Sequence, residues 1–215
     1  MTSSCRSCAP AEPAVRRIQQ LAHPAWPHPP AAYDAAVGLA TLELDDLLGL
    51  LAHPPAPPPT ELGRTLSRHD PTLWVRCVQV WVCLGLLHHR TDEPWPDSTR
   101  RRVLLDLLWG VEDWVTEAAL FALVTAAWVD PSVRDEVARV AAERLGDAVE
   151  VAQRRPVGVL RSLAHLVLAT PSAEPAAVDT AKLLLARDGA GPVAPRQRRF
   201  TRLLDRLWRR LTRHA

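Results

Sequence analysis

The chain has 215 residues, and 47% of them are apolar, which is enough to bury a sizeable core. Leu, Ala and Val supply most of that fraction, whereas Tyr occurs once and Phe twice. This composition favours an all-α fold. The N-terminus has no apolar signal sequence, and no run of about eighteen uncharged apolar residues occurs. We therefore expect a cytoplasmic protein that does not span a membrane.

The charge is unevenly distributed along the chain. The net charge is +2, but residues 196–215 contain eight arginines and one acid, Asp205, so the remaining residues are net acidic. This asymmetry indicates a basic tail that has its own partner or docks on the acidic body. Lys182 is the only lysine, a bias that a GC-rich genome, such as that of some bacteria, produces and that we do not interpret as functional.

The four cysteines do not predict a metal centre. Cys77 and Cys83 fall within an apolar helical pattern and are interpreted as small buried hydrophobic residues. The CxxC pair at residues 5–8 has no second pair, and a tetrahedral zinc site would need the distant His23 and His28. We predict a reduced, unliganded tail and no cofactor.

The first part of the chain reads as an arm followed by a helix and a linker. Residues 1–30 are rich in Pro and Ala and predict a flexible N-terminal arm, with one short helix near Val15–Leu21. A dense apolar pattern predicts a helix over Tyr33–Ala52. The run HPPAPPP, residues 53–59, then ends it as a stiff extended linker.

Helix-capping signals mark most of the later helices. Thr60 is a predicted cap, and Asp70 followed by Pro71 is a strong helix start, since proline at the first helical position loses no hydrogen bond. The polar segment 88–97 ends that helix. Further helices are predicted over residues 61–69, 98–109, 114–129, 132–147, 156–169 and 175–187.

The best-preserved stretch, Asp113–Asp147, is related to its neighbours by an internal repeat. An offset of 40 residues superposes Trp74 on Trp114 and Leu84 on Val124, and an offset of 34 then matches the following helices. A third copy is weaker. A period near 40 with two helices in each unit is typical of a helical solenoid.

The residues that carry this repeat resemble the HEAT-repeat family in its short bacterial form. DPSVRDEVARVAAERLGD, residues 130–147, is similar to the family pattern DPxVRxxAxxxLG, and residues 70–85 are similar with a two-residue insertion. The two Val-Arg pairs lie 58 residues apart, so the repeats are degenerate, and which helix opens each pair stays open. The resemblance implies helix-capping roles for the Asp residues and bonds to neighbouring helices for the Arg residues at Asp70, Asp130, Arg76 and Arg134.

The resemblance also implies the architecture. It predicts an all-α, right-handed α-α superhelix of the armadillo-like class, with about four degenerate helix pairs over residues 31–190. The basic amphipathic segment 191–215 would then be a capping helix, since repeat arrays need a polar outer face at each end.

Two groups of polar residues are candidate sites. His88, His89, Asp92 and Glu93 have metal-ligand chemistry, but adjacent histidines point in different directions, so we interpret the segment as a solvated loop. Asp113 lies beside Trp114, as a carboxylate would in a HEAT-like DNA glycosylase. It also follows Gly110 at a helix start, and we therefore interpret it as an N-cap.

The C-terminal segment is the remaining candidate. Phe200, Leu203, Leu204, Leu207, Trp208 and Leu211 have the spacing of one helix face, with arginines around them. Such a helix suits an acidic protein surface, nucleic-acid phosphates or an anionic membrane, besides the capping role. The partner-binding candidates are Arg199, Arg202, Arg206, Trp208, Arg209, Arg210 and Arg213.

No catalytic signature appears elsewhere in the sequence. We therefore predict a non-catalytic HEAT-like scaffold or adaptor that binds another protein, with Asp113 as the one catalytic alternative. The competing interpretations are a nucleic-acid-binding or glycosylase-like protein, and membrane attachment through residues 196–215. The oligomeric state stays open.

Overall fold

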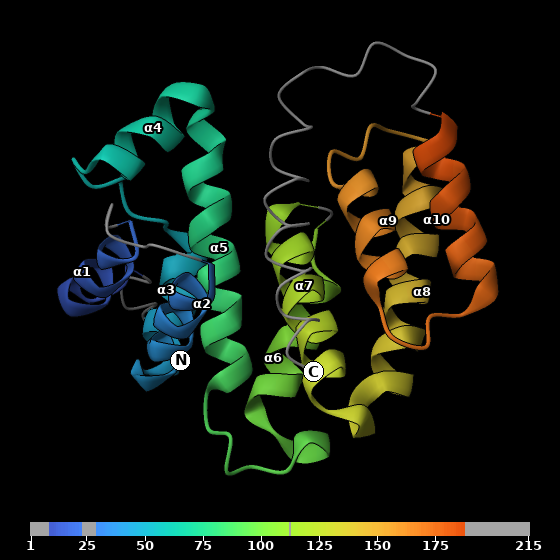
Figure 1. Cartoon of the computed structure of the whole chain (residues 1–215), viewed down its shortest axis with the longest axis horizontal. Helices are drawn as coiled ribbons and strands as arrows, with labels where there is room; N and C mark the ends of the chain where they lie inside the picture. Colours follow the sequence, from blue (N-terminus) through green and yellow to red (C-terminus); the bar gives the residue numbers. More distant parts are fainter. Residues whose placement is uncertain (1–8, 23–28, 112, 188–215) are drawn as a thin grey trace, which may run out of the picture. The chain divides into compact units, whose positions relative to one another are not determined.

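The computed structural model describes residues 9–22, 29–111 and 113–187, and within them every regular element is a helix, as Figure 1 shows. The all-α prediction is confirmed. The chain divides into two compact units, Met1–Val103 and Leu104–Ala215. This division falls inside the 31–190 region predicted as one repeat domain, and that assignment stays a prediction. No helix formed by the described residues is long and apolar enough to cross a membrane.

The first unit is built around one long helix, α5. The helices α2, α3 and α4 and the short 3₁₀ helix η1 all pack against α5 (Figure 1). Trp74 of α5 is only 2% exposed and meets Trp81 edge to face, with 5.8 Å between ring centroids. The elements of this unit are α1 (Glu12–Gln20), α2 (Pro29–Val37), η1 (Gly38–Thr41), α3 (Leu44–Ala52), α4 (Glu61–His69), α5 (Pro71–His88) and η2 (Trp95–Asp97), and α6 (Thr99–Leu108) spans the unit boundary.

Predicted caps begin α4 and α5. The hydroxyl of Thr60 accepts from the amide of Gly63 at 3.1 Å, and a carboxylate oxygen of Asp70 accepts from the amide of Thr72 at 2.9 Å. Each side chain satisfies an amide that has no partner within its own helix. Thr60 also donates to the Ala22 carbonyl at 2.7 Å. Both caps are confirmed.

Side chains from three helices hold the proline-rich linker against the unit. The indole nitrogen of Trp74 donates to the Pro55 carbonyl at 2.7 Å, and Gln19 donates to the next carbonyl, that of Ala56, at 3.1 Å. Arg64 donates to the Pro59 carbonyl at 2.7 Å. The linker has no regular secondary structure, as predicted, because proline lacks the amide that a helix or strand would use.

The described part of the predicted N-terminal arm forms a helix, α1, which overlaps the short helix predicted near Val15–Leu21. Ala14, Ile18 and Ala22 recur at intervals of four residues and are 0% exposed, so α1 buries one full face. The amide of Ala11 also donates to Asp46 of α3 at 2.8 Å. An apolar stripe at helical spacing outweighs a proline-rich composition. Residues 1–8 and 23–28 of the predicted arm lie outside the described residues.

The single helix predicted over Tyr33–Ala52 is also wrong. It is two helices, α2 and α3, separated by η1 and an extended residue, Glu43, with φ −65° and ψ 149°. The break lets Leu39 of η1 turn inward, where it is 0% exposed and lies against Gly85 of α5. Tertiary packing therefore interrupts a pattern that is helical throughout.

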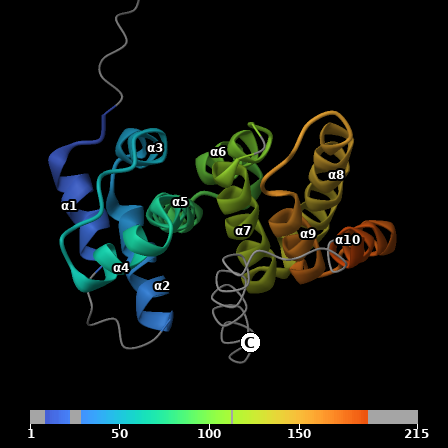
Figure 2. The same ribbon diagram turned by 90° about the horizontal axis from the view of Figure 1, so that it is seen from above.

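The second unit is a stack of helices in which near neighbours pack together. α7 packs on α8 and α9, and α10 packs on α8 and α9 (Figures 1 and 2). α7 is buried continuously from Thr116 to Ala127, which explains why it is apolar around its circumference. The elements are α7 (Trp114–Val129), η3 (Pro131–Val133), α8 (Arg134–Ala152), α9 (Leu160–Ala169) and α10 (Pro175–Arg187). The helix predicted from residue 156 begins four residues later, after Gly158.

Side chains on one helix bind the carbonyls at the end of another in this unit. Arg134 donates from Nε to the Ala127 carbonyl at 3.0 Å, and Trp128 donates to the Ala169 carbonyl at 2.8 Å. Asp130 accepts from the amide of Ser132 at 2.9 Å. The roles that the family resemblance implies for Asp130 and Arg134 are confirmed, since the last carbonyls of a helix need outside donors.

Candidate functional site

The C-terminal end of α5 is anchored to α2. The hydroxyl of Tyr33 lies 2.8 Å from Nε2 of His88, and the two rings are nearly perpendicular, at 88°. Burial, and then the positive charge of Arg100, lowers the pKa of His88. Burial, and then the carboxylate of Asp34, raises the pKa of Tyr33. Both shifts favour a pair in which the Tyr33 hydroxyl and the His88 imidazole are neutral.

The two adjacent histidines point to different partners, as predicted. Nδ1 of His89 lies 3.1 Å from the Ala40 carbonyl of η1, whereas His88 faces Tyr33 of α2. Within residues 9–22, 29–111 and 113–187, no group of three or more His, Cys, Asp and Glu side chains is arranged to hold a metal ion. Cys5, Cys8 and His23 lie outside the described residues.

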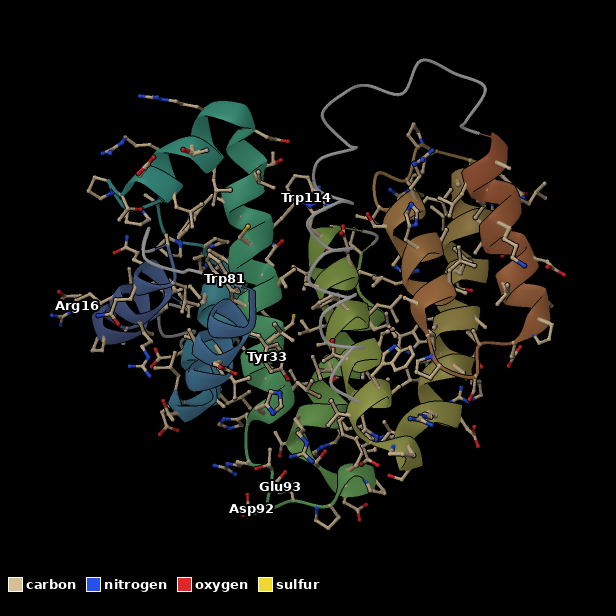
Figure 3. All side chains as sticks on the ribbon, in the orientation of Figure 1. Arg16, Tyr33, Trp81, Asp92, Glu93 and Trp114 are labelled. Carbon is tan, nitrogen blue, oxygen red and sulfur yellow. The ribbon has the colours of Figure 1, made fainter. Side chains whose placement is uncertain are left out.

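The acidic residues of the loop after α5 have different surroundings. Asp92 and Glu93 lie next to each other where the chain leaves α5 (Figure 3), and Asp92 is exposed. Glu93 accepts from the amide of Thr99 at 2.7 Å, and this hydrogen bond is the main cause that lowers its pKa. Arg100 donates to the Arg90 carbonyl at 3.1 Å and lies over the Trp95 ring. The bond from the Thr99 amide makes the Glu93 carboxylate an acceptor for the first amide of α6.

The burial of His88, together with the nearby charge of Arg100, predicts acid sensitivity below pH 6.5. Because the folded state lowers the pKa of His88 from its ordinary value of 6.5, the unfolded chain binds this proton more readily. The stabilisation is complete above about pH 6.5 and is lost as the pH falls through the folded-state pKa. Glu93 acts in a separate window, below its ordinary value of 4.5. Urea unfolding between about pH 7.5 and 5 measures the loss. A His88→Gln variant should flatten the pH dependence, and an unchanged slope contradicts the prediction.

Asp113 is the N-cap of α7. One of its carboxylate oxygens accepts from the amides of Val115 and Thr116, at 2.9 and 3.3 Å. Its backbone is extended, as an N-cap requires. The hydroxyl of Thr116 also donates to the Val111 carbonyl at 2.6 Å, which fixes the turn before the helix. The cap interpretation of Asp113 is confirmed.

Removal of this cap should have a measurable but limited effect. Asp113→Ala is expected to lower the free energy of unfolding by about 1 kcal/mol, whereas Asp113→Asn keeps an acceptor and should lose only a few tenths. Chemical denaturation of the two variants checks the difference. Equal losses would contradict the capping role. A base-excision activity that Asp113→Asn abolishes in a folded chain would instead support the catalytic alternative.

The two described cysteines are buried to different degrees. Cys83 is 0% exposed, whereas Cys77 is partly exposed. Burial raises the pKa of Cys77 to about 12 and also raises that of Cys83. The thiolate form, which is the nucleophile and the metal ligand, is therefore disfavoured at both positions. Their interpretation as apolar packing residues is supported by this environment.

A groove between α8 and α10 is a feature that the sequence did not predict. Its volume is about 340 Å³. A Cβ built on Gly146 would meet nothing within 4 Å, so the groove is open at this position. The groove is lined by Arg139, Ala142, Glu143, Leu145, Gly146, Glu174, Ala176, Ala177 and Thr180. The sequence signal for the groove is a pair of small residues on the exposed side of a helix, Ala142 and, four residues later, Gly146.

The groove has a small-residue floor and a charged rim. Leu145 is 1% exposed and closes the floor, and Ala177 is 9% exposed. Arg139 pairs with both carboxylate oxygens of Glu143, at 2.9 and 3.0 Å. Because Glu174 adds a second carboxylate, two acids lie against one base, and the lining carries a net negative charge.

A second hollow lies in the first unit. The hollow has a volume of about 360 Å³, and it is lined by Pro57, Pro58, Pro59, Gly63, Arg64 and Arg68.

The C-terminal arginines predicted to bind a partner, together with Trp208, lie outside the described residues. Comparison of the chain with models of known protein families, with curated proteins and with solved structures finds no match in any of the three.

Proposed function

We propose that this protein is a non-catalytic, HEAT-like repeat scaffold or adaptor that acts in the cytoplasm by binding a helix of another protein. The observation that carries the proposal is the groove between α8 and α10. It is formed by two helices that are not consecutive in the chain, which is how stacked helix pairs create binding surfaces.

The shape of the groove suits a helix better than a small molecule. Small side chains at Ala142, Gly146 and Ala176 would let a third helix approach closely, because the distance between packed helices depends on the side chains at the contact. A partner would place its apolar side chains on this floor. Arginines or lysines beside them would lie near Glu143 and Glu174. We therefore propose an amphipathic, basic helix as the ligand.

Photo-cross-linking in the cells that produce the protein tests this function. A benzophenone amino acid at Ala176, an exposed position in the groove, should form a product with another protein. Mass spectrometry should map the linked site to a basic amphipathic segment. The product should disappear when Gly146→Arg fills the groove and reverses its charge. Gly158 is a matched control position, because it is also exposed and a Cβ there would meet nothing within 4 Å.

Three results would contradict the proposed function. The first is the absence of a product with another protein at Ala176. The second is a product that persists in Gly146→Arg or that Gly158→Arg removes equally. The third is a linked segment that is acidic or not amphipathic, since the carboxylates of the groove would repel it.

The charge of residues 196–215 favours a second candidate function, binding to phosphates. A net charge of +7 would attract nucleic acid or an anionic membrane. Duplex binding that weakens steeply with salt and needs residues 196–215 would support the nucleic-acid alternative. Co-sedimentation with vesicles of anionic lipid that is lost in Trp208→Ala would support the membrane alternative.

A further inference from the structure

We infer that the groove between α8 and α10 binds the chain's own basic C-terminal segment, residues 199–213, when no partner is present. The inference rests on the proposed use of the groove as a helix-binding site and adds its regulation. The segment lies outside the described residues, and its sequence supplies the charge and the apolar pattern of the ligand.

The two charges are complementary. Residues 104–187 contain twelve acids against eight arginines and lysines, and the groove lining likewise contains two acids and one arginine. Next to the lining, Asp147 is exposed on α8. A helical register of residues 199–213 would place arginines beside an apolar face that contains Trp208. The groove offers both matching parts, a small-residue floor and carboxylates on its rim.

The connection is long enough. α10 forms one wall of the groove and ends at Arg187, and the eleven residues 188–198 join it to the proposed ligand. Fully extended, these residues reach about 36 Å. The whole of α10 is only about 20 Å long. Residues 199–213 can therefore reach the groove at any level.

Covalent attachment makes even a weak contact significant. A short flexible connection holds a ligand at an effective concentration in the millimolar range. A free partner helix therefore has to displace a tail that is present at this effective concentration before it binds. The tail would therefore raise the threshold for partner binding, and its arginines would be withheld from other acidic surfaces until it is displaced.

Hydrogen–deuterium exchange on the purified full-length chain tests this contact without a partner. We expect the amides of residues 199–213 to exchange about tenfold more slowly than those of an unfolded segment. Gly146→Arg should remove this protection, and Gly158→Arg, the same substitution at an exposed position outside the groove, should leave it unchanged. Raising the salt concentration should weaken it, because exposed charge pairs are screened.

A charge reversal in the tail provides an independent check. Replacing Arg206, Arg209 and Arg210 by glutamate should restore fast exchange in the tail. The same variant should also speed exchange at the amides of residues 142–146 and 176–180 if the tail covers them. Protection that survives Gly146→Arg, or a tail that exchanges freely in the unmodified chain, overturns the inference. Protection that depends on protein concentration also overturns it, because the ligand would then be the tail of a second copy.

The outcomes separate this inference from the proposed function. A tail that exchanges freely, together with a groove product in cells, removes only the self-binding. A protected tail without any groove product in cells removes the scaffold function and keeps the internal contact.

Discussion

Arg144→Ala is expected to lower the free energy of unfolding by about 3 kcal/mol or more. Arg144 is 2% exposed, and its guanidinium donates from Nε to the Leu108 carbonyl at 2.9 Å and from Nη2 to the Gly110 carbonyl at 3.2 Å. Leu108 is the last residue of α6 and Gly110 lies two residues after it, where no amide of the same helix can reach their carbonyls. The truncation removes two charge-assisted hydrogen bonds and leaves a void in a packed interior.

Arg139→Ala is the matched control, because it removes an arginine from the exposed side of the same helix. Its pair with Glu143 spans one helical turn at the surface, so the expected loss is about 0.5 kcal/mol or less. Arg144→Lys should fall between the two, since one ammonium group cannot reproduce the fork of the guanidinium. Urea unfolding followed by far-ultraviolet circular dichroism measures all three. Equal losses for Arg144→Ala and Arg139→Ala would contradict the anchoring role.

The local signals in the sequence predicted many helix boundaries. Asp70, Asp113 and Thr60 cap helices because the side chain that satisfies the first amides lies within three residues of them. Proline at the first helical position and a polar loop after His88 are equally local. Such signals need no knowledge of the fold. For the same reason α10 begins at its predicted residue, Pro175.

The sequence-based predictions fail where distant residues decide the structure. The break between α2 and α3 depends on Leu39 packing against Gly85, 46 positions later in the chain. The burial of α1 depends on contacts with α3. Proline content predicts an arm, but Ala14 and Ile18 on one face of α1 are buried, and so are Leu21 and Ala22 directly after it.

The candidate site could be predicted only in part. That His88 and His89 diverge follows from the geometry of adjacent residues, but Tyr33 as the partner of His88 comes from 55 positions earlier. The groove requires α8 and α10 to lie side by side with α9 between them in the chain. Its small residues were visible in the sequence, yet only the packing shows that they line an open surface rather than a core.

Two helical glycines provide a test with opposite signs. A Cβ added at Gly85 would lie 2.8 Å from Cβ of Leu39 and 3.5 Å from the Ala36 carbonyl, and both neighbours are 0% exposed. Gly85→Ala therefore forces α5 away from η1, and this overpacking should outweigh the roughly 1 kcal/mol that alanine gains in a helix. The expected result is a net loss of about 1–2 kcal/mol.

At Gly146 the same substitution meets nothing within 4 Å, so the helix-propensity term acts without opposition. Gly146→Ala should therefore raise the free energy of unfolding by about 0.5–1 kcal/mol in a chain without residues 199–213, in which the tail cannot cover the groove. Thermal and urea denaturation of both variants give the two signs directly. Stabilisation by Gly85→Ala would show that α5 and η1 are not held at the distance described. Destabilisation by Gly146→Ala in the chain without residues 199–213 would show that another side chain already fills the groove at this position. Destabilisation by Gly146→Ala that occurs only in a chain with residues 199–213 would locate the tail against α8.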